Sequence, residues 1–252
     1  MLNYIFADYK RIMARIPRII LIVIFNAIFV GMILDKWNKA AGNFTSVTFL
    51  DSATAFFGFF FMFLVALIDF VQTFTFDFRA KTIQVALGIG VSRFQVVVSK
   101  LIQLALVLLT DLLITVMLLF ILSGIMGVFM NFQQVSFLLL NGLCSITLVT
   151  CSAALLMPVI FRTQSMVLAL IGYFILVPGI LSTALSILAQ LGPDFLQDLH
   201  LDRYMHDSVI NLSFTNAIQG AFQLWPILLS IAWFAVGIYL TWLAFRKMEL
   251  DF

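Results

Sequence analysis

Six long apolar runs constrain the fold of this chain more than any other feature of its sequence. They cover residues 18–34, 53–76, 101–127, 135–157, 165–189 and 226–245. A transmembrane helix needs about 20 predominantly apolar residues. A soluble chain of 252 residues could not bury this much apolar surface, because 63% of its residues are hydrophobic and only 10% are charged. We therefore predict an all-α, polytopic membrane protein with six transmembrane helices.

Two of the runs carry signals at specific positions. The first run is short, and we expect Arg18 at its start to snorkel toward the membrane surface. This run has no small-residue cleavage pattern, so it is expected to be an uncleaved span. Pro178 and Gly179 interrupt the fifth run and predict a kink or break there. No repeat or low-complexity linker divides residues 1–252, so we expect one transmembrane domain.

Basic residues are distributed unevenly between the two predicted sides of the membrane. Three lie on one side, namely Lys36, Lys39 and Arg203. Eleven lie on the other side, in the N-terminal segment, the 77–100 loop, the loop at Arg162 and the C-terminus. The positive-inside rule predicts that both termini and the 77–100 loop are cytoplasmic, in a plasma-membrane protein. The net charge of +2 is too small to indicate a nucleic-acid partner.

Residues 1–17 have the pattern of an amphipathic helix. Apolar residues recur at steps of three and four, and Asp8, Lys10, Arg11 and Arg15 lie on the opposite face. A basic face of this kind suits anionic lipid headgroups. We expect this helix to lie flat on the cytoplasmic surface of the bilayer; the alternative is a charged N-terminal tail.

The 190–225 segment is expected to be an extracellular element, part of which packs on the membrane face as a short helix. It contains both histidines, His200 and His206, among several aspartates. An acidic surface loop explains this pattern without a metal ion, so we expect no metal site. Cys144 and Cys151 lie seven residues apart within one apolar run, and we expect them to be small core residues.

The segment 77–95 breaks the apolar pattern between the second and third runs. Residues 77–87 contain helix formers without proline, and Gly88 and Gly90 predict a helix stop and a tight turn. Ser92 and Gln95 have the spacing of a capping box, which predicts a new helix that continues into the third run. A short helix with mixed apolar and basic residues is typical of a segment that fills a groove on a soluble partner.

The same segment resembles the coupling loop in the permeases of type-2 ABC exporters. The similar features are Asp77, Thr82-Ile83, Gly88 to Gly90, Ser92-Arg93 and Ser99-Lys100. In that family the loop forms a coupling helix seated in a cleft of the ATP-binding subunit. The resemblance implies that the ATPase contacts of this chain are Asp77, Arg79, Lys81, Thr82, Ile83, Leu87, Ser92 and Arg93, with Arg162 in a second cytoplasmic contact.

The resemblance also implies the partners. The N-terminal helix is similar to the connecting helix of the family, and the 190–225 segment to its external element. The expected assembly has two ATPase subunits, identical or related, and a second permease subunit in a homodimer or heterodimer. The expected cargo is an amphipathic peptide toxin or antimicrobial peptide, with drugs and lipids as alternatives.

The chain lacks the motif that would let it hydrolyse ATP itself. A P-loop requires a glycine followed by lysine, and no glycine in this chain is followed by lysine. We therefore expect a non-catalytic membrane subunit without a cofactor of its own, with ATP and magnesium bound by the partner ATPase.

Polar residues within the second and third runs are candidate translocation residues. They are Asp69, Gln72, Thr73, Gln103, Thr110 and Asp111. We expect no lysine or arginine at the depth of the two aspartates, so each must be protonated, hydrogen-bonded or hydrated. The sequence leaves two interpretations open. These side chains form hydrogen bonds between helices, or they line a substrate path or a dimer seam.

Two other functions remain as alternatives. An ion-coupled secondary transporter would use Asp69 and Asp111 as proton sites. An intramembrane enzyme would need clustered catalytic groups, but both histidines are predicted to be external and the one glutamate is Glu249 near the C-terminus. A serine–histidine dyad would therefore require the external segment to fold inward.

Overall fold

The protein is a bundle of helices, several of which are long and apolar. The computed structural model describes residues 2–40, 43–79, 82–191, 200–221 and 223–246, and within these ranges the secondary structure is helical without a β-strand. Five helices are long and apolar enough to cross a membrane, and a bent pair makes a sixth if it counts as one span. The prediction of an all-α, polytopic membrane protein is confirmed at this level.

The helices follow the predicted runs with shifted ends. Their bounds are α1 (Leu2–Met13), α2 (Ile16–Lys39), α3 (Ser46–Ala55), the π-helix η1 (Phe56–Val65), α4 (Ala66–Arg79), α5 (Thr82–Gly88), α6 (Arg93–Ile125), α7 (Phe132–Thr163), α8 (Met166–Leu176), α9 (Ile180–Leu191), the 3₁₀-helix η2 (Leu201–Tyr204), α11 (His206–Ile218) and α12 (Leu224–Arg246).

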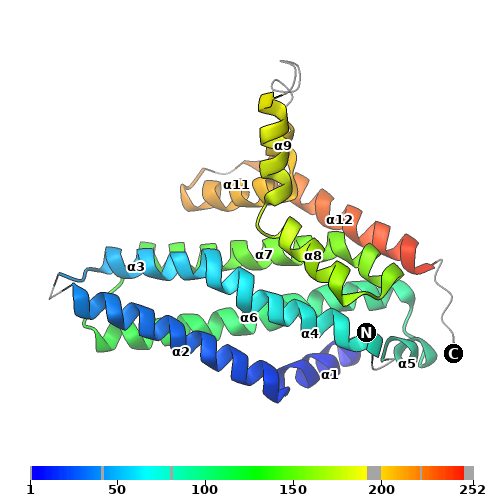
Figure 1. The fold of residues 1–252 in the computed structure, drawn as a ribbon, viewed down its shortest axis with the longest axis horizontal. Helices are drawn as coiled ribbons and strands as arrows, with labels where there is room; N and C mark the ends of the chain where they lie inside the picture. The colour runs from blue at the N-terminus through cyan, green and yellow to red at the C-terminus, as the bar shows by residue number, and fades with distance from the viewer. Residues whose placement is uncertain (1, 41–42, 80–81, 192–199, 222, 247–252) are drawn as a thin grey trace.

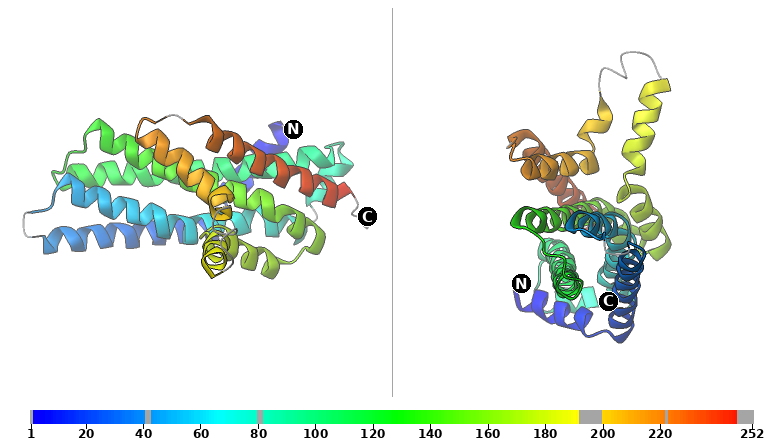
Figure 2. Two further views of the ribbon diagram at one scale, coloured as in Figure 1. Left: turned by 90° about the horizontal axis from the view of Figure 1, so that it is seen from above. Right: turned by 90° about the vertical axis from the view of Figure 1, so that its left-hand side faces the viewer.

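The long helices lie side by side with nearly parallel axes. Figure 1 shows α2, the α3–η1–α4 run, α6 and α7 in this arrangement, with α1, α5 and the last turn of α12 at one end of the bundle. We call this end the terminal end. Viewed along the bundle axis, α1 runs across the space between α6 and α2 (Figure 2).

Helix α7 forms the centre of the bundle, and α12 lies at its edge. In the apolar window of α7, 67% of the residues are buried, against 11% in α12. The two helices approach closely because Gly237 has no side chain: a Cβ atom there would lie 2.8 Å from the carbonyl carbon of Ala154. Small residues permit such close packing between membrane helices.

The second run is longer and less regular than predicted. It begins at Ser46 in α3 and passes through the π-helix η1 before α4. At the end of η1, the amide of Ala66 bonds the carbonyl of Phe61, five residues back. The carbonyl of Met62, which an α-helical Ala66 would bond, instead accepts a 2.5 Å hydrogen bond from the hydroxyl of Tyr173. A contact from α8 thus supports the altered register of this span.

The predicted break in the fifth run is present. Helices α8 and α9 are bent by 55°, and Gly179 adopts a positive φ of 71° between them, which is a conformation that glycine tolerates best. Figure 1 shows α9 pointing away from the long helices. The fifth run therefore does not form a single straight span.

Part of the segment after α9 folds back onto the bundle. Residues 192–199 lie outside the described ranges. Helix α11 packs against α7 and α12, so His206 is 1% exposed. We expected both histidines in a surface loop; this is wrong for His206, whereas His200 is exposed. Cys151 is buried beside Ile210 of α11 as a free thiol, which agrees with its predicted place in the core.

Candidate functional site

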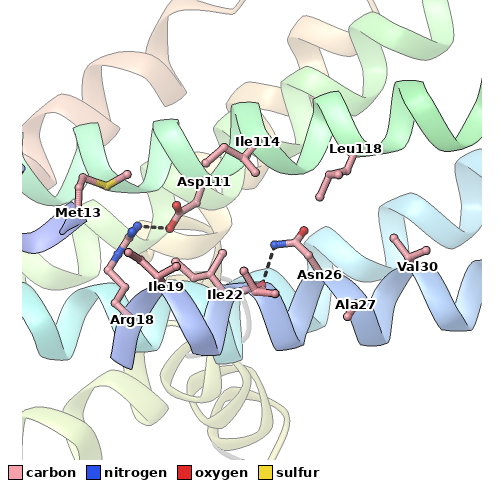
Figure 3. A pocket seen from close by; sticks show the side chains of 11 residues that line it. Met13, Arg18, Ile19, Ile22, Asn26, Ala27, Val30, Asp111, Ile114 and Leu118 are labelled. Atoms are coloured by element: carbon pink, nitrogen blue, oxygen red, sulfur yellow. Dashed lines mark hydrogen bonds and ion pairs between the residues drawn. The ribbon is translucent and has the colours of Figure 1, made fainter. Parts of the chain in front are cut away.

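Three buried charges join α2, α4 and α6, and we call them the charged cluster. Arg18 donates from Nε to Oδ1 of Asp69 at 2.7 Å and from Nη2 to Oδ2 of Asp111 at 2.5 Å. The three side chains are 2%, 0% and 1% exposed. Figure 3 shows Arg18 and Asp111 facing each other across the space between α2 and α6. One cation therefore faces two carboxylates inside the bundle.

The charged cluster corrects the expectation that no arginine lies at the depth of these aspartates. Arg18 does not snorkel to the surface. Helix α1 ends at Met13, Arg15 is extended (φ −72°, ψ 117°), and Pro17 lies at the start of α2. This connection begins α2 inside the bundle, so its first turn faces α4 and α6. The sequence did carry a signal for this cluster. Asp69 and Asp111 lie within apolar runs without a nearby base in the same run, and Arg18 lies at the edge of the first run.

Further polar contacts extend from the charged cluster toward the terminal end. Arg15 donates to Oε1 of Gln72 at 2.5 Å, and the hydroxyls of Tyr9 and Thr110 lie 2.8 Å apart. These contacts give Gln72 and Thr110, two of the predicted translocation residues, hydrogen-bond partners on the N-terminal segment.

The N-terminal helix is formed over Leu2–Met13, and one charge of its polar face, Asp8, is buried against protein. Lys100 of α6 forms a buried ion pair with Asp8, which also contacts Arg11. Lys100 lies 5.6 Å from the ring centre of Tyr4. Of the two basic residues on α1, Lys10 is exposed and Arg11 is partly exposed. The expectation that this face meets lipid headgroups is therefore wrong for Asp8, which pairs with Lys100 of α6. For Lys10 and Arg11 it stays a prediction.

Several polar atoms around the charged cluster have no hydrogen-bond partner among the described residues. They are Oδ2 of Asp69, Oδ1 of Asp111, the hydroxyl of Thr73 and both amide atoms of Gln103. Thr73 and Gln103 are each 0% exposed. Buried polar groups are nearly always bonded to protein or water. The side chains of Thr73 and Gln103 therefore form no hydrogen bond with another described helix. Hydrogen bonding between helices, one of the two interpretations of these residues, does not account for them.

An apolar groove lies beside the charged cluster, with a volume of about 610 Å³. Its walls come from α2 and α6, and Met13 at the end of α1 lines it near Arg18 and Asp111 (Figure 3). The lining comprises Met13, Arg18, Ile19, Ile22, Val23, Asn26, Ala27, Val30, Asp111, Ile114 and Leu118.

A second candidate site is the elbow, by which we mean residues 82–94: α5, the turn after it and the first two residues of α6. Gly90 has a φ of 90°, and the predicted capping box is present. Ser92 Oγ accepts from the amide of Gln95 at 3.2 Å, and Gln95 Oε1 accepts from the amide of Ser92 at 3.0 Å. The chain therefore makes a sharp, capped turn between α5 and α6 at the terminal end (Figure 1).

The residues predicted to contact an ATPase differ in their surroundings. Asp77 and Arg79 lie near the end of α4, and Thr82 begins α5, but the side chains of all three lie outside the described set, as does the whole of Lys81. Ile83 is 5% exposed and belongs to the hydrophobic core, so it faces the bundle. Leu87 is half-buried and packs against the same core.

The exposed apolar residues of the elbow are different ones. Val85 is 63% exposed, Ile89 73%, and Phe94, in the first turn of α6, 50%. We call these three residues the apolar tip; they lie on α5, after it and at the start of α6, on either side of the capped turn.

Arg93 and Arg162 differ in their contacts: Arg93 is bonded to the end of α12, whereas Arg162 is exposed. Arg93 donates to the carbonyls of Phe245 and Arg246 at 2.7 and 2.8 Å, and its guanidinium lies 5.5 Å from the ring centre of Phe245. It therefore ties the elbow to the end of α12, where helix carbonyls need donors. Arg162 is exposed in the last turn of α7.

A serine–histidine contact lies elsewhere in the bundle. Oγ of Ser152 is 3.0 Å from Nε2 of His206, because α11 folds inward onto α7. Nδ1 of His206 is 3.9 Å from Asp207, which accepts a 2.5 Å hydrogen bond from Ser182. Ser152 and His206 are 0% and 1% exposed, so the closed arrangement gives a substrate no access to the serine.

Among the described residues, no group of three or more histidine, cysteine, aspartate or glutamate side chains is arranged to hold a metal ion. Comparison of the chain with known protein families and with curated proteins finds no match.

Proposed function

We propose that this chain is the permease subunit of an ATP-driven exporter, with the elbow as its contact with a separate ATPase. The observation that carries the proposal is the apolar tip of Val85, Ile89 and Phe94 on a capped turn at the terminal end. Exposed apolar residues around a capped turn suit a groove on a soluble partner. The resemblance of the segment 77–95 to the coupling loop of type-2 ABC exporters supports the same assignment.

The helices that flank the elbow suit the transmission of movement. Helix α4 leads into α5, and the elbow leads into α6, which runs for 33 residues. The same two helices carry Asp69 and Asp111, which Arg18 holds together. In the proposed mechanism, closure of the ATPase subunits moves the elbow, and α4 and α6 carry that movement to the charged cluster.

The rest of the assembly follows from the family resemblance and the distribution of charge. The terminal end is cytoplasmic, the protein lies in the plasma membrane, and a second permease subunit completes the pore. Cargo is an amphipathic molecule, with peptides, drugs and lipids as candidates. Thr73 and Gln103, buried without hydrogen-bond partners, support a hydrated path near α4 and α6.

The test is a charge placed on the tip of the elbow. The full-length chain is purified from its native membranes after mild crosslinking, and vanadate-sensitive ATP hydrolysis is measured in the purified fraction. Val85→Glu should reduce this activity at least tenfold, because an apolar groove rejects a carboxylate. Val47→Glu is the matched control: Val47 is 58% exposed on α3, far from the elbow (Figure 1).

Two results would contradict the proposal. One is a wild-type fraction without vanadate-sensitive ATPase activity. The other is full transport by reconstituted protein from a proton gradient alone, which would favour the ion-coupled alternative. The charged cluster supports that alternative, because it has two carboxylates, Asp69 and Asp111, and one arginine. One of the two carboxylates is then available to carry a proton.

A further inference from the structure

We propose that a groove between α3, the start of α7 and the end of α11 binds an uncharged amphiphile with a sugar-like, hydroxyl-bearing head and one apolar chain. The inference goes beyond the proposed function, because the groove involves neither the elbow nor the charged cluster and its binding does not depend on an ATPase. It rests on the uncharged lining, on polar groups without partners and on the change from polar to apolar lining along α7.

The groove lies at the end of the bundle opposite the terminal end. Helix α6 begins at the elbow and runs for 33 residues, so the start of α7 lies at the far end, beside α3 (Figure 1). Helix α7 packs there against both α3 and α11. The groove has a volume of about 670 Å³, which is within the range of small-molecule sites, roughly 300–1,000 Å³.

The first turn of α7 gives the groove a polar rim without charge. Asn131, Gln133 and Gln134 lie within four positions, followed by Ser136. Phe132, which is 85% exposed, adds an aromatic ring that an apolar sugar face can contact. None of the described residues that line the groove is charged. A charged head would lose water here without an ion pair to compensate it, whereas an uncharged head loses less.

Part of this rim is committed to capping α7, and part remains open. Oδ1 of Asn131 accepts from the amide of Gln134 at 2.8 Å, and Oε1 of Gln134 accepts from the amide of Asn131 at 3.0 Å. Nε2 of Gln134 donates to Ser46 of α3 at 3.2 Å. Within the described part of the chain, the groups left without a partner are Nδ2 of Asn131, the side-chain amide of Gln133 and the hydroxyl of Ser136. They offer both donors and acceptors, which suits hydroxyl groups.

Further along α7 the lining becomes apolar. Phe137 and Leu140 of α7 line the groove together with Leu50 of α3 and Ile218 of α11. Leu140 lies seven residues beyond Gln133, which corresponds to about 10 Å along the helix axis. The groove therefore suits a molecule with a polar head at the start of α7 and an apolar chain beside the following turns.

The lengths of the helices allow the head to remain at the membrane surface. Helices α6 and α7 have 33 and 32 residues, or about 50 and 48 Å, whereas the hydrocarbon core is about 30 Å thick. Three amide side chains within Asn131–Gln134 would be costly inside that core. We therefore expect the rim to lie at the surface and Leu140 to lie at the level of the lipid chains.

The experiment measures binding to the full-length protein in phosphatidylcholine nanodiscs prepared without a glycoside detergent. The probe is radiolabelled dodecyl maltoside, and empty nanodiscs give the background from partition into lipid. Unlabelled dodecylphosphocholine and dodecanol are competitors with the same chain and a charged head or almost no head. We expect saturable binding of the maltoside that neither competitor displaces as well as unlabelled maltoside does.

The first pair of variants tests the polar rim. Gln133→Leu should weaken maltoside binding about fivefold, the effect expected from loss of one uncharged hydrogen bond. Gln133 is exposed, so the change should leave the fold intact. Gln219→Leu is the matched control, since Gln219 is also exposed and does not line the groove; it should bind as the wild type does.

The second pair tests the space of the groove. Ala217 of α11 is exposed and lines the groove, so Ala217→Trp should fill it and weaken maltoside binding at least tenfold. Thr215→Trp is the matched control, because Thr215 is exposed on the same helix and does not line the groove. If Ala217→Trp fails to fold, the pair at positions 133 and 219 still decides the question.

The same variants identify the natural source of the molecule. Lipids that co-purify with the protein from its own membranes are identified by mass spectrometry. A glycolipid that accompanies the wild type and is lost from Ala217→Trp would make the membrane the source. Binding of the probe without a co-purified glycolipid would make a free glycoside the ligand.

Three outcomes would overturn the inference: equal displacement by dodecylphosphocholine and unlabelled maltoside, wild-type affinity in both Gln133→Leu and Ala217→Trp, or a co-purified phospholipid that Ala217→Trp displaces. Failure of the proposed function is a separate result. A wild-type fraction without vanadate-sensitive ATPase activity that still binds the maltoside would reject the exporter and keep the groove, and the reverse pair of results would reject the groove alone.

Discussion

Arg18 and Asp111 are 93 positions apart in the sequence, yet a 2.5 Å hydrogen bond joins Nη2 of the arginine to Oδ2 of the aspartate. The bond connects the first turn of α2 with the middle of α6 where both side chains are almost fully buried. Asp69 of α4 shares the same guanidinium. One arginine therefore links side chains of three helices, α2, α4 and α6.

Loss of Arg18 should be far more costly than loss of either acid. In Arg18→Leu, two buried carboxylates lose their cation, and removal of one partner of a buried pair costs about 3–5 kcal/mol. In Asp69→Asn, a matched Arg18–Asp111 pair remains, so we expect a cost of about 1 kcal/mol or less. Unfolding of the purified variants, followed by tryptophan fluorescence, compares the two. Equal destabilisation would show that Arg18 does not compensate both aspartates.

The ion pair between Asp8 and Lys100 should hold α1 against α6. Lys100→Met keeps the length of the side chain and removes its charge. Of the two described ion pairs of Asp8, only the pair with Arg11 then remains. Backbone amides of α1 should then exchange hydrogen at least tenfold faster, because local opening of the helix becomes easier. Lys10→Met, at an exposed position of α1, is the control. Unchanged exchange in Lys100→Met would mean that the apolar contacts of Ile5 and Ile12 are sufficient.

The spans, the capped turn and the break near Gly179 could be predicted because local sequence determines them. An apolar run of about 20 residues, a Ser-x-x-Gln pattern and a Pro-Gly pair each act over a few positions. The structure has corresponding features at α2, α6, α7 and α12, at the start of α6, and between α8 and α9.

The charged cluster could not be predicted in the same way, because it depends on where the connection before Pro17 places Arg18. Snorkelling to the surface and ion pairing inside the bundle are both open to an arginine at the edge of a span. The packing of α11 against α7 is likewise determined by tertiary contacts. The local sequence around His206 has the pattern of a polar loop and does not indicate this packing. Local pattern does not reveal the partner Ser152, which lies 54 positions away.

Two glycines with nearly the same backbone conformation should respond differently to alanine. Gly179 and Gly220 have φ values of 71° and 70°. A Cβ atom at Gly179 would lie 2.4 Å from Oδ2 of Asp207, whereas at Gly220 it would meet nothing within 4 Å. Gly220→Ala should cost about 1–2 kcal/mol of backbone strain. Gly179→Ala should cost more, because the clash also disturbs the contact between Asp207 and Ser182.

Thermal unfolding of the two alanine variants in the same detergent checks this difference. If Gly179→Ala and Gly220→Ala unfold at the same temperature, the close approach of α11 to the break between α8 and α9 does not contribute to stability.

His206 should make the stability of the protein depend on pH. Burial lowers the pKa of His206 below its ordinary value of 6.5, and the neighbouring Asp207 carboxylate opposes this without overcoming it. The unfolded chain therefore binds a proton at a higher pH than the folded chain does. The folded state is favoured fully above pH 6.5, and stability is lost as the pH falls from there toward the lowered pKa. Each unit by which the pKa is lowered corresponds to about 1.4 kcal/mol.

The measurement compares unfolding temperatures between pH 8 and pH 5 for the wild type, His206→Gln and His200→Gln. The glutamine at position 206 keeps a hydrogen-bonding group near Ser152 but cannot titrate, so this variant should lose less stability on acidification than the wild type does. His200 is exposed, so His200→Gln should follow the wild type. A His206→Gln curve parallel to the wild-type curve would mean that α11 opens and admits water before the imidazole is protonated, and that the burial of His206 against α7 does not control stability in this range.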